Sequence, residues 1–205
     1  MSWWFSPFYD RFMQRAEEDS LRVWRAELLS TLEGEVLDLG AGTGANVPYW
    51  PEAVEHVVAT EPDAGMARRL RERARSAGKI EVVEAPAERL PFADEAFDAV
   101  VSTLVLCTVD DLAASIAEIH RVLRPGGRLV FVEHVASDKR PLRKLGQRVL
   151  EPLWKPIAGG CHLTRRSHEA IERGGFTLED LTRESMRGAM PVVRETVRGT
   201  ARKRK

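Results

Sequence analysis

The residues best placed to do chemistry follow a short apolar run near position 40. Residues 36–44 read Val-Leu-Asp-Leu-Gly-Ala-Gly-Thr-Gly. The apolar start is typical of a parallel strand buried on both faces. The alternate glycines after it predict a tight turn that another molecule can approach closely, which a Cβ would prevent. Asp38 adds a carboxylate at the end of the strand, and a carboxylate with no neighbouring cation suits a cationic ligand, such as one carrying an ammonium and a sulfonium.

The spacing of these glycines excludes two common phosphate sites. The pattern is G-x-G-x-G, whereas the dinucleotide fingerprint is G-x-G-x-x-G. No Gly-Lys-Ser/Thr ending follows, so a phosphate-cradling loop is not indicated.

Around this turn, strand-like and helix-like segments alternate. Strands are expected at residues 35–40, 56–61, 80–85, 97–106, 128–135, 175–182 and 192–202, and helices at 64–77, from an N-cap at Asp110, and at 167–174. Such alternation predicts an α/β fold with a parallel sheet and ligands at the carboxyl ends of its strands. Val193, Thr196 and Val197, with charges between them, suggest a half-exposed antiparallel edge strand.

The composition indicates a single intracellular domain. The chain has 205 residues, with 31 basic and 31 acidic side chains, so no net field attracts nucleic acid. Two cysteines, Cys107 and Cys161, make no disulfide framework, which fits a reducing cytoplasm. No apolar run approaches the ~20 residues that span a bilayer, and no secretory signal is visible. No cluster of metal ligands is visible.

Residues 38–44 match without a gap the D/E-x-G-x-G-x-G motif of the class I S-adenosylmethionine-dependent methyltransferases, and nearly the whole chain resembles that family. The resemblance implies a Rossmann-like fold: a seven-stranded, mostly parallel sheet with the last strand antiparallel and helices on both faces. It implies S-adenosyl-L-methionine as cofactor, with S-adenosyl-L-homocysteine as product. The alternative is a glycine-rich turn in another doubly wound protein. The expected cofactor-binding residues are Asp38, Gly40, Ala41, Gly42, Thr43, Gly44, Glu61, Pro62, Met66, Ala87, Glu88, Thr103 and Leu104.

Two of these residues have specific expected roles. Glu61, 21 positions after Gly40, can accept two hydrogen bonds from a ribose diol, although a surface acid at a strand end is the alternative. Met66 can pack on an adenine face or belong to the core. Pro86 stands where the family has an adenine-binding Asp, so adenine recognition is expected from the Ala87 backbone and from Glu88.

Segments 103–109, 132–135, 150–154 and 160–165 resemble the methyltransferase-like seven group of thiol S-methyltransferases. The ubiquinone/menaquinone C-methyltransferases are more distant kin. The expected reaction is methyl transfer to a small or lipophilic acceptor, with a thiol as the best candidate. Phosphatidylethanolamine N-methylation at a membrane surface and a non-catalytic cofactor-binding homologue are the alternatives.

His134, at the end of the expected fifth strand, is the candidate catalytic base for a thiol, and the alternative is a structural histidine. Strand alternation points Glu133 the other way. Cys107 is expected to pack. His162 and Arg165 can close the acceptor pocket, although Arg165 also suits a surface position at a helix start.

Two further segments are expected to serve the acceptor side. Residues 1–30, rich in aromatic side chains, are interpreted as a helical lid, and residues 136–170 as a helical insertion beside the acceptor. Peripheral membrane contact is the other interpretation of both, because aromatic and basic side chains suit the headgroup region. The expected partner is thus a small-molecule or lipid acceptor, with no nucleic acid, in the cytoplasm or at the membrane surface.

Overall fold

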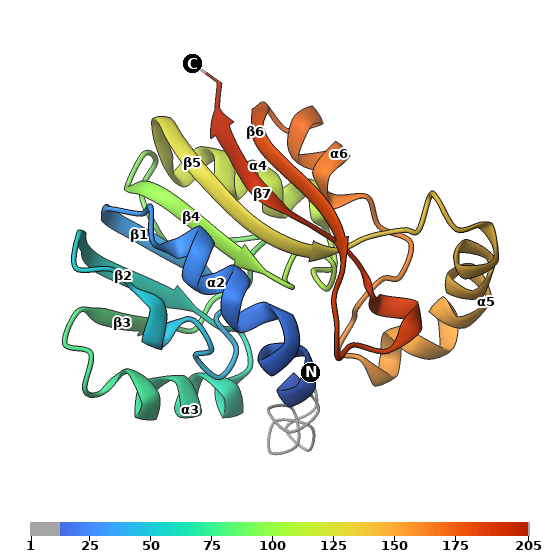
Figure 1. The fold of residues 1–205 in the computed structure, drawn as a ribbon. Helices are drawn as coiled ribbons and strands as arrows, with labels where there is room; N and C mark the ends of the chain where they lie inside the picture. Colours follow the sequence, from blue (N-terminus) through green and yellow to red (C-terminus); the bar gives the residue numbers. More distant parts are fainter. Residues whose placement is uncertain (1–12, 205) are drawn as a thin grey trace.

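A computed structural model describes residues 13–204 of the chain, and in it seven strands form one sheet (Figure 1). The strand order is β3-β2-β1-β4-β5-β7-β6. The strands are β1 (Gly34–Leu39), β2 (Val54–Thr60), β3 (Ile80–Val83), β4 (Phe97–Thr103), β5 (Leu123–His134), β6 (Phe176–Ser185) and β7 (Glu195–Lys203). Neighbours from β3 to β5 pair in parallel, and β7 pairs antiparallel with both β5 and β6. The mostly parallel sheet with an antiparallel last strand is therefore confirmed.

The expectation that the last strand lies half-exposed at an edge is wrong. β7 lies between β5 and β6, so β6 is the edge strand, and Val193, Thr196 and Val197 are all buried. The charged residues of this segment are ion-paired: Glu195 pairs with Arg143, and Arg198, which follows Val197, pairs with Glu184 of β6. An alternation of apolar and charged residues therefore fits an ion-paired interior strand as well as an edge.

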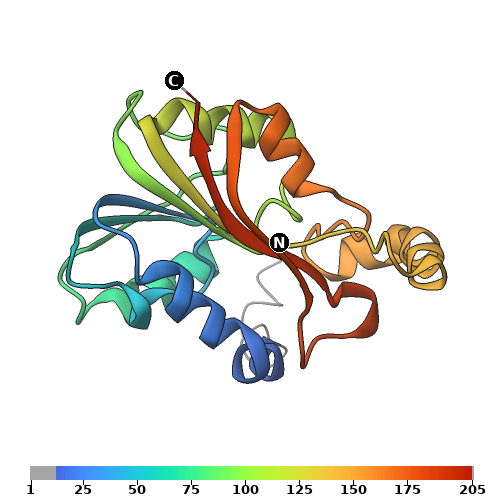
Figure 2. The ribbon, with the colours of Figure 1, turned by 45° about the horizontal axis from the view of Figure 1, so that its top comes forward.

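Helices cover both faces of the sheet, as the alternation predicts (Figures 1 and 2). The helical segments are η1 (Glu17–Leu21), α2 (Arg22–Leu29), η2 (Val47–Tyr49), α3 (Ala64–Ala74), α4 (Leu112–Val122), α5 (Pro141–Ile157), α6 (Ser167–Arg173) and η3 (Pro191–Val193). The helix expected to start from Asp110 is capped one residue later, because the Asp111 side chain accepts the N–H groups of Ala113 and Ala114.

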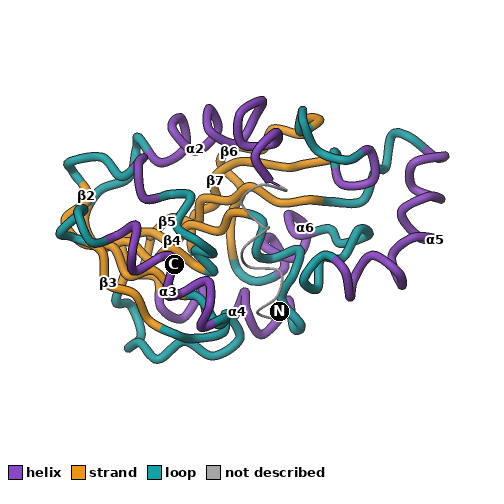
Figure 3. The backbone as a smooth tube through the Cα atoms, turned by 90° about the horizontal axis from the view of Figure 1, so that it is seen from below, coloured by secondary structure: helices purple, strands orange, loops and turns teal. Residues whose placement is uncertain are grey.

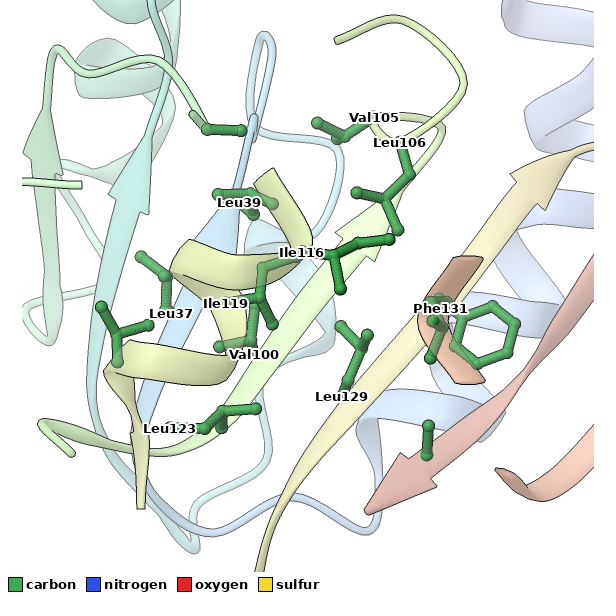
Figure 4. Close-up of a cluster of buried hydrophobic side chains, with 14 of the residues drawn as sticks. Leu37, Leu39, Val100, Val105, Leu106, Ile116, Ile119, Leu123, Leu129 and Phe131 are labelled. Carbon is green, nitrogen blue, oxygen red and sulfur yellow. The ribbon is translucent and has the colours of Figure 1, made fainter. Parts of the chain in front are cut away.

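The apolar core is split by the sheet, because successive side chains of a strand point to opposite faces. Leu37, Val100 and Phe131 pack with Ile116 and Ile119 of α4 in the larger cluster (Figure 4). The neighbouring strand positions pack on the opposite face, beneath α2. The strands are thus held rigidly, and their carboxyl ends form a fixed platform for a site.

One helix stands apart from these layers. α5 follows β5 and projects sideways beyond the sheet (Figures 1 and 3). It lies within the segment expected as an acceptor-side insertion, residues 136–170.

Candidate active site

The turn after β1 is built from glycines in the left-handed region. Gly40, Gly42 and Gly44 have φ values of 57°, 59° and 92°. A Cβ on Gly40 would lie 2.8 Å from the methyl groups of Val105, whereas a Cβ on Gly42 would meet nothing within 4 Å. Gly42 lines a large cavity at the carboxyl ends of the strands, so the turn brings bare backbone to the cavity wall.

Glu61, directly after β2, holds this turn in place from inside the cavity. Its two carboxylate oxygens accept the N–H of Gly42 and the N–H of Asp63, each at 2.9 Å. Burial raises the pKa of Glu61, and these two hydrogen bonds oppose the rise. A carboxylate offers about four lone-pair sites, so Glu61 keeps acceptor capacity for a ligand.

Asp38 lies behind the turn, joined to the N-terminal helical segment by a buried relay. Asn46 donates to Asp38 at 2.7 Å, Arg25 donates to the Asn46 oxygen at 2.5 Å, and Arg25 pairs with Glu17 at 2.8 Å. Burial raises the pKa of Asp38 to about 7, against the hydrogen bond from Asn46. Near neutral pH, binding of a cationic ligand beside Asp38 would therefore favour the ionised form of its carboxyl group. The expectation that Asp38 has no neighbouring cation is wrong, because the positive charge of the buried Arg25 also lowers the pKa of Asp38. Sequence reasoning missed Arg25 and Asn46, since only the tertiary fold brings them to Asp38.

The loop after β3 forms the next wall of the cavity. Pro86, Ala87 and Glu88 all line it. The Glu88 carboxylate also accepts the backbone N–H groups of Asp110 and Asp111, at 2.9 and 3.3 Å, which ties this loop to the start of α4. Glu88 therefore has a structural role, in holding the start of α4, in addition to its position in the cavity wall.

The loop after β4 is shaped by Glu133, which does not line the cavity, whereas the next residue, His134, does. Leu104, directly after β4, has a φ of 60°. The fully buried Glu133 carboxylate accepts four hydrogen bonds, from the Ser102 hydroxyl at 2.7 Å and from three backbone N–H groups at 2.9–3.2 Å. Burial raises the pKa of Glu133 to about 7, against these bonds. Glu133 is thus a scaffold for the loop, a role that sequence reasoning did not assign.

His134 lies in the cavity wall at the end of β5. It is 8% exposed, and its Nδ1 has no hydrogen-bond partner among the described residues. Burial lowers the pKa of His134 to about 4, against a backbone hydrogen bond with Val193. The imidazole is therefore neutral at physiological pH, with a nitrogen available to a ligand.

The wall beside His134 is mainly apolar and comes from three distant segments. Trp154 and Ile157 come from α5, Cys107 and Cys161 are free cysteines, and Met186 follows β6. These side chains carry no charge, and the charged residue that α5 adds to the cavity lining is Lys155, between Trp154 and Ile157. The wall beside His134 is therefore mainly apolar and suits an apolar group.

His162 and Arg165 lie outside the cavity lining. His162 contacts Glu151 at 3.1 Å. Arg165 donates to the carbonyls of Leu106 and Asp110, at 2.8 and 3.4 Å, and so holds the loop after β4 from behind.

The whole cavity has a volume of about 860 Å³ and lies where the strand order reverses between β1 and β4. Ligands of doubly wound folds bind at this switch point. Of the residues predicted from sequence, Gly40, Gly42, Glu61, Pro62, Met66, Ala87, Glu88, Thr103, Leu104 and His134 line it. Asp38, Ala41, Thr43 and Gly44 lie outside the lining. Met13 and Ala16, from the segment 1–30 interpreted as a lid, also line it, whereas residues 1–12 of that segment lie outside the described residues. Sequence reasoning missed Asp63, Met186, Gly188, Ala189 and Met190, which line it from other segments.

Residues 37–131 match the family model described as a methyltransferase domain. The chain is 34% identical to human thiol S-methyltransferase TMT1A over 186 residues, 85% of this chain and 75% of that protein. The chain belongs to the class I S-adenosylmethionine-dependent methyltransferases.

Further relatives agree with this assignment. The methyltransferase is 38% identical to thiol S-methyltransferase TMT1B of Rattus norvegicus over 71% of its own length, but the match spans only 61% of that relative. It is 34% identical to a demethylmenaquinone methyltransferase of Beutenbergia cavernae, over 74% of this chain and 63% of that one. Among solved structures, the [4+2]-cyclase SpnF superposes with a TM-score of 0.73 at 22% identity, covering 91% of this chain and 80% of that chain, which shows the shared fold.

The cofactor that this family implies, S-adenosylmethionine, fits the residues of the cavity. A bare glycine turn, a carboxylate with free acceptor sites and the buried Met66 meet at one end. Both carboxylates near the turn favour a cation. Among the described residues, no group of three His, Cys, Asp or Glu side chains could hold a metal ion.

Replacing Glu61 should weaken S-adenosylmethionine binding. We expect Glu61→Ala to lose about 1.5–3 kcal/mol, the scale of a hydrogen bond to a charged group. Calorimetry should therefore show roughly 10- to 150-fold weaker binding. The control is Glu84→Ala, which removes a half-exposed glutamate paired with Arg71. Equal affinity of Glu61→Ala and the control would contradict the assignment.

Cofactor affinity should also depend on the charge of Asp38. A cationic ligand favours the carboxylate, and the pKa of Asp38 is about 7, so affinity should fall as pH drops below about 7. The slope should not exceed about tenfold per pH unit. Asp38→Asn keeps an oxygen for Asn46 to donate to and should flatten the profile measured by calorimetry. A variant whose profile keeps the wild-type slope would show that another group titrates.

Proposed function

We propose that this methyltransferase transfers the methyl group of S-adenosylmethionine to the sulfur of a small lipophilic thiol. The observation that carries the proposal is the mainly apolar half of the cavity, where His134 lies among apolar side chains and two thiols. Among the described lining residues, His134 is the only imidazole. A lipophilic thiol gains from burial there, whereas a charged acceptor would lose its hydration. The two relatives named thiol S-methyltransferases support the choice of sulfur.

The chain's own residues supply positioning and a proton acceptor. When bound, S-adenosylmethionine supplies an electrophilic methyl on a sulfonium. We assign the glycine turn and Glu61 to holding the cofactor, and the loop shaped by Glu133 to fixing the cavity wall between cofactor and acceptor. Such positioning is the main requirement of an in-line displacement.

We assign His134 as the acceptor of the thiol proton. The proton of the thiol S–H bond would pass to Nδ1 of His134, and the electron pair left on the thiol sulfur would form the new S–CH₃ bond. The electron pair of the S–CH₃ bond that breaks would return to the sulfur of the cofactor. Because the pKa of His134 is about 4, the imidazole is always in its accepting form near neutral pH but is a weak base. It therefore accepts a hydrogen bond from the thiol and assists ionisation, which the neighbouring positive charge of the sulfonium also favours.

A panel of matched acceptors tests the choice of sulfur. Release of S-adenosylhomocysteine should be measured with an alkyl thiol, the alcohol and the amine of the same carbon skeleton, a quinol, and phosphatidylethanolamine in vesicles. We expect turnover with the thiol, increasing with its chain length. Faster turnover of the amine, the quinol or the phospholipid would overturn the proposal, and so would turnover with none of them.

A further inference from the structure

The face of α5 that points away from the protein is apolar and uncovered. Gln147, on the inner side, is buried and donates to the carbonyls of Val135 and Val192. The outer side carries large apolar side chains at helical spacing, and Leu142 is 85% exposed. This apolar stripe consists of Leu142, Leu145, Val149, Leu150, Leu153 and Ile157, all of them exposed in the described part of the chain. A soluble protein rarely leaves so continuous an apolar patch without a use for it.

Positive charge borders the stripe. At 100° per residue, Arg148 and Lys155 lie along one side of the stripe, and the exposed Lys139 and Arg140 precede the helix. Lys144 lies on the same side but is paired with Asp138 at 3.1 Å. The one acidic residue within α5, Glu151, is engaged by His162 and Thr164. The surface that α5 presents is thus apolar with a cationic border, which is complementary to an anionic, lipophilic partner.

The stripe also runs into the active-site cavity. Ile157 belongs to the stripe and lines the cavity, and Trp154 and Lys155 line it beside Ile157. The helix stands clear of the sheet, so a flat surface can approach it (Figure 3). No described helix is long and apolar enough to cross a membrane. The stripe of α5, a helix of 17 residues, would therefore meet a membrane with the helix axis parallel to the membrane surface.

We propose that α5 lies in the interface of an anionic lipid bilayer, with the mouth of the cavity facing the lipid. The stripe enters the acyl boundary and the cationic border meets the headgroups. A second copy of the chain fits less well, because stacking two stripes would bring together two cationic borders with no free acid on α5. The proposal does not rest on the thiol as acceptor, since membrane binding is measured without turnover.

Vesicle flotation with the full chain tests this. We expect the protein to float with vesicles of phosphatidylcholine and phosphatidylserine and to float far less with phosphatidylcholine alone. The triple variant Leu142→Gln, Val149→Gln and Leu153→Gln should bind about tenfold more weakly or worse. The variant Lys139→Gln, Arg140→Gln and Arg148→Gln should lose about fivefold per removed charge, with the loss shrinking at high salt. The matched control is Val23→Gln, an apolar residue of α2 that is 60% exposed.

Three results would overturn the proposal. One is an absence of flotation with anionic vesicles. Another is wild-type flotation of the apolar triple variant. The third is a wild-type dimer, seen by analytical ultracentrifugation, that the apolar triple variant converts to a monomer while vesicle binding is unchanged. Thermal melts of all variants should match the wild type, because each changed side chain is exposed.

Discussion

Gly42→Val is expected to abolish S-adenosylmethionine binding while the protein stays folded. Gly42 has a φ of 59°, and a side chain there would meet no protein atom within 4 Å and would project from the cavity wall. A branched side chain would therefore take the space of the ligand and would also strain the turn whose N–H is held by Glu61. Calorimetry should detect no binding at cofactor concentrations that saturate the wild type.

The chain offers a matched control for backbone strain. Gly78, in the turn between α3 and β3, has a φ of 65° and likewise no atom within 4 Å of an added Cβ, but it does not line the cavity. Gly78→Val should lose similar stability in a thermal melt yet bind cofactor normally. If both variants bound equally well, or lost binding together, the glycine turn would not be the cofactor site.

His134→Ala is expected to slow methyl transfer to a thiol by about 10²-fold at neutral pH, the lower end of the range for acid–base catalysis. The lower end applies because burial lowers the pKa of His134 to about 4, which leaves a weak base. Cofactor affinity should barely change, because the glycine turn and Glu61 are unaffected. Rapid-quench measurement of the chemical step, with calorimetry in parallel, separates the two effects.

The pH dependence of this variant distinguishes proton transfer from support of the fold. The deficit should shrink as pH rises towards the pKa of the thiol, because the acceptor then ionises unaided. The wild-type rate should show no His134 titration between about pH 5 and pH 8, since the imidazole is already neutral there. A deficit that is constant with pH would assign His134 to positioning, and near-normal turnover would make it structural.

The parts of this molecule that could be predicted from sequence are those set by local rules. The glycine turn, the carboxylate of Glu61 and the placement of His134 follow from strand ends in a parallel sheet, and the structure brings all three to one cavity. The order of β6 and β7 was missed because β7 alternates apolar and charged residues, which is typical of an edge strand. In the interior of the sheet its charges are accommodated by ion pairs such as Arg198 with Glu184. The link from Arg25 to Asp38 was missed because it joins residues that are close only in the fold.

The acceptor half of the cavity could be predicted least. Trp154 comes from the segment 136–170 that was expected beside the acceptor, but Met186 reaches the cavity from a distant segment and carries no spacing that indicates a site. Acceptor pockets of this kind are assembled by loops and helices outside the conserved architecture of the fold, so shape and polarity can be read only once the chain is folded.

The central claim is transfer of an intact methyl group from S-adenosylmethionine to sulfur in this cavity. It is tested most directly by incubating the protein with methyl-deuterated S-adenosylmethionine and an alkyl thiol, and analysing the products by mass spectrometry. We predict a thioether that carries the complete labelled methyl group, in equal amount to S-adenosylhomocysteine, and none with Gly42→Val. A protein that binds the cofactor by calorimetry but yields no labelled thioether would contradict the claim.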